Sequence, residues 1–148
     1  MNRNIFVSRV LLVNGMLLLI LAFIHLFSTP LITKWLAREL TPETLKSISP
    51  PFLLNHMVVG VLLIPFGIST MYSAAGVRAG HTWARGIATT NALAVLVLPL
   101  LVITLMGSEY FSSKPFLAAA VLVTVIGLSM LLMLIWLVSK SKNQFSVK

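Results

Sequence analysis

The chain has 148 residues, of which 58% are hydrophobic and only 9% charged, and its formal net charge is +8. Soluble proteins average roughly 25% charged residues, so this composition predicts a membrane protein with little chain left for a soluble domain. Without such a domain there is nothing to host nucleic acid, and the positive charge bears on membrane orientation instead. The absence of cysteine excludes disulfides, thiolate metal sites and cysteine nucleophiles.

Four apolar stretches are long enough to cross a bilayer as helices: residues 10–29, 52–75, 84–106 and 115–138. They predict an all-α, polytopic membrane protein, a four-helix transmembrane bundle that forms a single transmembrane domain over residues 1–148. A basic start followed by an apolar run also fits a signal peptide. The run here is longer than the usual signal h-region and no small-x-small cleavage site follows His25, so we expect the first span to be retained.

The basic residues are distributed unevenly over the two sides of these spans. One side has seven basic residues and no acid: Arg3, Arg9, Arg78, Arg85, Lys140, Lys142 and Lys148. The other side combines four basic residues with every acid of the chain: Lys34, Arg38, Lys46, Lys114, Glu39, Glu43 and Glu109. Because cytoplasmic loops carry the excess of Lys and Arg, we expect both termini to be cytoplasmic.

The first span has small residues at seven-residue intervals, which favours close packing against another helix: Ser8, Gly15, Ala22 and Thr29. Its two strongly polar residues, Asn14 and His25, are eleven residues apart. At about 100° per residue they project within ~20° of each other, so both can face the same neighbour. Hydrogen bonding between helices accounts for Asn14 without further chemistry.

Residues 30–51 are predicted to form a partly helical outer loop. Its first half is a short amphipathic segment, which Trp35 would anchor in the membrane interface. Thr41-Pro42-Glu43 is typical of a helix start, with a capping hydroxyl, an N1 proline and an acid near the positive end of the dipole. That role explains Glu43. Glu39 has no such role, and a solvated carboxylate beside a basic residue is its simplest interpretation.

The second span enters the membrane through Asn55 and His56. Gly60, Gly67 and Ala74 follow at seven-residue intervals, and His56 projects within ~20–40° of this stripe of small residues. An ionisable group on such a face points into the helix assembly rather than at lipid.

The third span carries Asn91 near its cytoplasmic end. Together with side chains at a similar depth on the first two spans, it predicts a polar layer in the inner leaflet, made of Asn14, Thr70, Ser73 and Asn91. The fourth span contains nothing ionisable, and its small residues predict a packing face only.

His25 and His56 form the sharpest candidate site. Both lie on faces of small residues of neighbouring antiparallel spans, and helix rise places them at similar depths in the outer leaflet. The predicted ligand-binding set combines them with the adjacent amide and the loop carboxylates: His25, Asn55, His56, Glu39 and Glu43. A hydrogen bond to a headgroup or to a backbone carbonyl is the simpler alternative for each histidine.

Three functions remain open. The leading hypothesis is a non-catalytic binding or accessory protein that holds a hydrophobic ligand or partner helices in the bilayer, from other membrane proteins or a second copy. In the second, His25 and His56 ligate the iron of haem b or a divalent metal. In the third, the same histidines with Glu39 or Glu43 act on a lipid-like substrate. The spans contain no carboxylate, and a phosphate-binding loop, an HExxH pair and a serine elbow are absent from the sequence.

Overall fold

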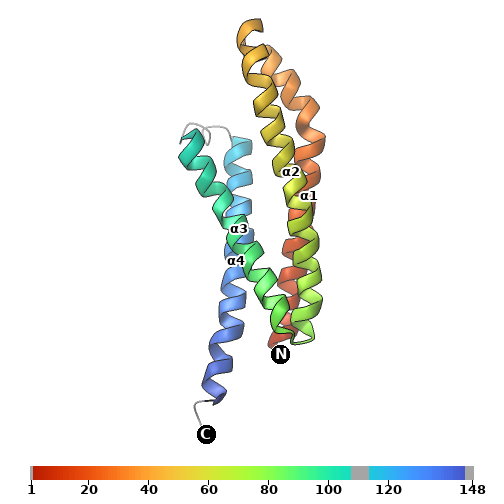
Figure 1. Ribbon diagram of the computed structural model, residues 1–148, viewed down its shortest axis with the longest axis vertical. Helices are drawn as coiled ribbons and strands as arrows, with labels where there is room; N and C mark the ends of the chain where they lie inside the picture. The colour runs from red at the N-terminus through yellow and green to blue at the C-terminus, as the bar shows by residue number, and fades with distance from the viewer. Residues whose placement is uncertain (1, 108–113, 146–148) are drawn as a thin grey trace. The chain divides into compact units, whose positions relative to one another are not determined.

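The computed structural model describes residues 2–107 and 114–145, and these residues form four helices (Figure 1). Their bounds are α1 (Arg3–Glu39), α2 (Pro42–Arg78), α3 (Thr82–Met106) and α4 (Lys114–Phe145). Each helix contains a segment long and apolar enough to cross a membrane. The prediction of an all-α protein with four membrane-spanning helices is therefore confirmed. Glu109 and Lys148, which entered the prediction of orientation, lie outside the described residues.

Large apolar side chains are exposed on every helix, for example Phe27, Leu54, Leu100 and Leu132. On a soluble protein, apolar surface on this scale would mark an interface or an aggregation hazard. Along helices of membrane-spanning length it is the surface that contacts acyl chains. The exposed surface thus supports the same conclusion as the composition.

Helices α1 and α2 are longer than the predicted spans. Helix α1 continues through Pro30 to Glu39, and α2 begins at Pro42 and continues through Pro50 and Pro51. Only residues 40 and 41 of the predicted outer loop are outside a helix. A proline removes one backbone donor, and helices tolerate it where hydroxyls and neighbouring helices satisfy the freed groups. The predicted helix start is confirmed, since Thr41 Oγ1 accepts a hydrogen bond from the Thr44 amide at 3.4 Å.

The chain divides into two compact units. Unit 1 comprises Met1–Gly15 and Ser69–Lys148, and unit 2 comprises Met16–Ile68. Both units include parts of α1 and α2, whereas α3 and α4 belong wholly to unit 1.

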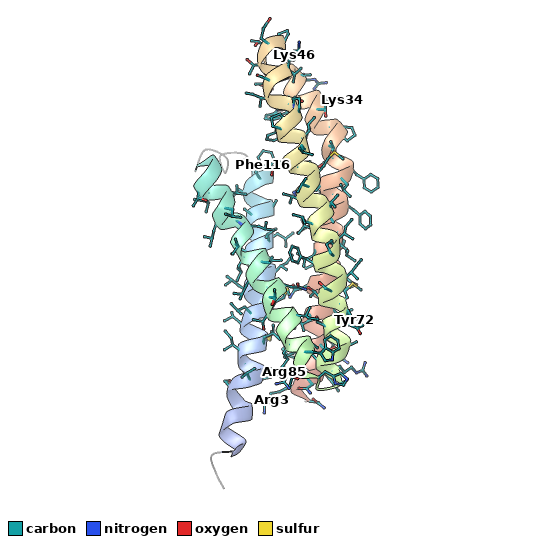
Figure 2. The ribbon with its side chains drawn as sticks, in the orientation of Figure 1. Arg3, Lys34, Lys46, Tyr72, Arg85 and Phe116 are labelled. Carbon is teal, nitrogen blue, oxygen red and sulfur yellow. The ribbon has the colours of Figure 1, made fainter. Side chains whose placement is uncertain are left out.

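Unit 2 is a helical hairpin built from residues 16–39 of α1 and residues 42–68 of α2. Its core includes Leu18, Ala22 and Leu63, which are almost completely buried. Gly60 lies at a close approach of the two helices, because a Cβ atom added there would be only 3.0 Å from the Cβ of His25. The hairpin ends in the turn after Glu39, with Lys34 and Lys46 on its two helices (Figure 2).

Unit 1 is centred on the contact between α3 and α4, which cross in Figure 1. On α3, Ala84, Ala88, Ala92 and Val95 are buried at intervals of about one helical turn, and of these Ala92 is close to Gly127 on α4 whereas Ala84 is close to Gly76 on α2. On α4, Gly127 lies so close that an added Cβ atom would be 2.7 Å from Leu96 Cγ. Small side chains therefore determine how closely these helices pack.

The two predicted stripes of small residues are largely buried. On α1, Ser8, Gly15 and Ala22 are buried, and Thr29 is half-buried. On α2, all three members are buried: Gly60, Gly67 and Ala74. Their predicted role as packing faces is confirmed.

Candidate functional site

The structure brings His25 and His56 together in unit 2. Their rings are stacked, with centroids 4.8 Å apart and planes inclined by 26°. One ring comes from α1 and the other from α2, and both side chains are half-buried. The sequence predicted this proximity because the two histidines have similar depths in their spans and both lie on faces of small residues.

Each ring is held by a backbone carbonyl. The Nε2 atom of His56 lies 2.8 Å from the His25 carbonyl oxygen and 3.1 Å from Ser28 Oγ. The Nδ1 atom of His25 lies 3.0 Å from the Leu21 carbonyl oxygen on its own helix. A carbonyl only accepts, so these contacts require a hydrogen on Nδ1 of His25 and on Nε2 of His56. The remaining ring nitrogen of each neutral histidine is an acceptor.

The absence of a side chain at Gly60 allows the His56 ring to reach the His25 carbonyl. Gly60 lies one turn after His56 on α2, on the surface that meets α1. Because glycine has no Cβ, the α1 backbone comes close enough for the His56 ring to reach a carbonyl that already belongs to the α1 hydrogen-bond ladder. The hydroxyls of Ser28 and Thr29 also donate to that carbonyl, at 3.2 and 3.1 Å. The result is a compact polar clasp between two apolar helices.

Of the other three residues of the predicted ligand set, Asn55 directly precedes His56 on α2, and the two carboxylates lie apart from the histidines. Asn55, Glu39 and Glu43 are exposed. Glu39 is fourteen residues beyond His25 on α1, and Glu43 thirteen residues before His56 on α2. At about 1.5 Å per residue, each carboxylate is about 20 Å along its helix from the histidine. Within the described ranges, no group of three or more His, Asp or Glu side chains is arranged to hold a metal.

The ring geometry also bears on haem. Two axial histidines approach one iron from opposite faces, with a nitrogen of each ring aimed at the metal. Here the rings are stacked face to face, and Nε2 of His56 is engaged by a carbonyl and a hydroxyl. Ligation of one iron by both rings would require them to separate, with Nε2 of His25 and Nδ1 of His56 as the nitrogens left to bind it. The observed arrangement fits a clasp between helices.

Hydrogen bonds in unit 1 involve the residues of the predicted inner polar layer. The Asn91 amide on α3 donates to Ser69 Oγ at 2.8 Å and to Thr70 Oγ1 at 3.0 Å, both on α2. The Ser73 hydroxyl donates to the Ser69 carbonyl at 2.7 Å. Asn91, Thr70 and Ser73 are all buried. Ser69 was not included in the predicted layer, although it directly precedes Thr70.

Asn14 makes a second contact of this kind. It is buried, and its amide donates to Ser129 Oγ on α4 at 2.8 Å. Ser129 in turn donates to the Ile126 carbonyl at 2.9 Å. The sequence alone gave no reason to choose Ser129, because that choice requires knowing that the start of α1 packs against α4.

A double-mutant cycle on Asn14 and Ser129 should measure this contact. We expect Asn14→Ala and Ser129→Ala to show a coupling of about 0.6 kcal/mol, the average for hydrogen bonds within membranes. The measurement is the free energy of unfolding in mixed detergent micelles. A coupling indistinguishable from zero would mean that the two side chains do not bond in the folded protein.

Unit 1 also has a groove of about 520 Å³ between α3 and α4. Its polar lining comes from Arg85 and Thr89 on α3 and Ser139 on α4. The remaining lining is apolar and comes from α4: Leu131, Leu134, Ile135 and Val138. The sequence interpretation of α4 as a packing face missed this groove. The spacing of its apolar residues at i, i+3, i+4 and i+7 marks one helix face, but an all-apolar helix has such a spacing on every face.

We compared the chain with models of known protein families, with curated proteins and with solved structures, and none of the three comparisons found a match.

Proposed function

We propose that this four-span integral membrane protein is a non-catalytic binding protein that holds a lipid-like ligand in the groove between α3 and α4. The observation that carries the proposal is the groove itself, an apolar trough on α4 with an arginine and two hydroxyls among its lining. Its volume of about 520 Å³ lies in the range of small-molecule sites, about 300–1,000 Å³. Such sites are mostly apolar and use a few polar groups to orient the ligand.

The polar side chains elsewhere support a binding role over a catalytic one. In the part of the chain that the structure describes, no buried side-chain nitrogen or oxygen lacks a hydrogen-bond partner. The bonds of His56, Asn91 and Asn14 connect one helix to another. Groups engaged in this way hold the scaffold on which the groove is formed. Under this proposal the clasp of His25 and His56 fixes the hairpin of unit 2 and does not take part in a reaction.

The proposal includes an orientation in which both termini are cytoplasmic. The chain has no native cysteine, so single cysteines can report accessibility without background labelling. Ser47 and Ala79 are both exposed, in the hairpin of unit 2 and in the turn after α2, respectively. In intact cells we expect a membrane-impermeant maleimide to label Ser47→Cys and not Ala79→Cys, with both labelled after permeabilisation. The reverse pattern would invert the orientation.

A large side chain placed in the groove tests whether the groove binds lipid. Ile135 lines the groove and is 54% exposed, so a tryptophan fits there without disturbing the core. We expect Ile135→Trp to weaken lipid binding roughly tenfold, equivalent to ~1.4 kcal/mol of binding free energy, and so to lower the amount of lipid that co-purifies in mild detergent. The measurement is mass spectrometry of extracted lipids.

Val125→Trp is the matched control, because Val125 is 55% exposed on the same helix and does not line the groove. We expect it to retain lipid as the wild type does. Equal retention by all three proteins would refute the binding function.

A further inference from the structure

Building on the proposed binding function, we propose that the groove is a site for an anionic phospholipid, with its phosphate at Arg85 and an acyl chain along α4. Three observations carry this inference: the charge of unit 1, the depth of Arg85 and the shape of the apolar lining.

The charge of unit 1 is uncompensated where the structure describes it. Residues 2–15, 69–107 and 114–145 contain no aspartate or glutamate, whereas they contain several arginines, namely Arg3, Arg9, Arg78 and Arg85. The described acids of the chain, Glu39 and Glu43, belong to unit 2. A guanidinium at the edge of an apolar groove, with no carboxylate of its own unit among the described residues, is complementary to an anionic group from outside the chain.

The Arg85 guanidinium can donate hydrogen bonds to an anionic group. Its Nη2 atom is 3.5 Å from the Gly80 carbonyl oxygen, at the long limit for a hydrogen bond. A guanidinium has five N–H donors in a planar fork, which matches the geometry of a phosphate. Thr89 lies one turn further along α3, and Ser139 faces the groove from α4. The Thr89 hydroxyl can donate to an ester or a phosphate oxygen, whereas the Ser139 hydroxyl donates to the Trp136 carbonyl oxygen at 3.2 Å.

Aromatic residues indicate that the end of unit 1 that contains Arg85 lies at the membrane interface. Trp83 stacks on Tyr72 with ring centroids 5.2 Å apart, and it lies two residues before Arg85. On α4, the Trp136 ring has the Arg3 guanidinium 5.7 Å from its centroid. Figure 2 shows Arg3, Tyr72 and Arg85 at the same end of unit 1. Tryptophan and tyrosine concentrate at the level of the headgroups, so Arg85 lies at the depth of a lipid phosphate.

The apolar lining extends from that level toward the membrane interior. Leu131 and Val138 are seven residues apart, which spans about 10 Å along α4. Leu134 is 3% exposed and forms the floor, whereas Ile135 and Val138 are 54% and 42% exposed and form the wall. An acyl chain that continues from a phosphate at Arg85 would lie along this row. A basic site between transmembrane helices is the kind of site that recognises anionic headgroups.

The test is a lipid titration of the intact chain by native mass spectrometry. The probes are a phosphatidylglycerol and a phosphatidylcholine with identical acyl chains, so that only the headgroup charge differs. We expect the wild type to bind phosphatidylglycerol about tenfold more tightly, the scale of one strong ionic contact. Arg85→Gln should remove this preference and Arg85→Lys, which keeps the charge, should retain part of it.

Arg9→Gln is the matched control, because Arg9 is an exposed arginine of unit 1 that does not line the groove. It should keep the wild-type preference. An equal loss in Arg85→Gln and Arg9→Gln would overturn the site and leave only diffuse attraction to anionic lipid. Circular dichroism of each variant shows whether it is folded. If Arg85→Gln does not fold, the partial loss of preference expected for Arg85→Lys tests the site instead.

Two further outcomes separate this inference from the proposed function. If the wild type binds both lipids equally and Ile135→Trp weakens both, the groove is a lipid site and the headgroup assignment to Arg85 is wrong. If Ile135→Trp changes neither affinity, the groove does not bind lipid and both proposals fail.

Discussion

Replacing Gly127 with leucine is expected to destabilise unit 1 by about 2–3 kcal/mol, near the upper end of the range for overpacked cores. A Cβ atom at this position would be 2.7 Å from Leu96 Cγ and 3.3 Å from the Ala92 backbone oxygen. The Leu96 side chain can only partly move away. The Ala92 carbonyl can move only together with α3. Leucine would therefore force α3 and α4 apart where Gly127 packs against Ala92 and Leu96.

The measurement is the free energy of unfolding in mixed micelles, followed by circular dichroism. Gly86→Leu is the matched control, because an added Cβ atom there meets nothing within 4 Å. Glycine is disfavoured in a helix by up to about 1 kcal/mol relative to the best helix formers, so the control should be neutral or slightly stabilising. Equal destabilisation by both substitutions would show that the loss does not arise from packing between α3 and α4.

The helices and their packing faces were predictable because lipid imposes simple rules on sequence. Each span must be apolar for about twenty residues, and a close helix contact needs small residues on one face. The stripes through Ala22 and Gly60 were visible for that reason. The helical extension through residues 30–51 was not, because the cost of Pro30 or Pro50 depends on whether neighbouring groups satisfy the freed backbone. Sequence spacing carries no information on those neighbours.

The candidate site was predictable in position but not in its chemistry. Helix rise and the angle per residue place His25 and His56 opposite each other. Whether an imidazole nitrogen faces a metal or a carbonyl depends on side-chain rotamers and on the register of two helices within about an ångström. The groove beside Arg85 was hidden for another reason. In a helix that is apolar all round, periodicity does not separate a groove from a lipid-facing surface.

The close approach at Gly60 leads to the last prediction. We expect Gly60→Leu to destabilise the hairpin of unit 2 by about 2–3 kcal/mol, from overpacking of about 1–3 kcal/mol and hydrogen bonds worth about 0.6 kcal/mol each. An added Cβ atom would be 3.0 Å from the His25 Cβ and 3.1 Å from two carbon atoms of Leu26. Moving α1 away would lengthen the 2.8 Å contact from His56 Nε2 to the His25 carbonyl oxygen.

Two measurements test this prediction. One is the free energy of unfolding, and the other is the imidazole ¹⁵N chemical shifts, which report whether the hydrogen bond from Nε2 of His56 is lost. Val61→Leu is the control beside it, since Val61 is 54% exposed, and should alter neither quantity. His56→Leu removes the hydrogen bonds without the clash, so it should cost only about 1 kcal/mol. If Gly60→Leu were no more destabilising than His56→Leu, the ring contacts and not the absent Cβ would determine how closely α1 and α2 pack in this unit.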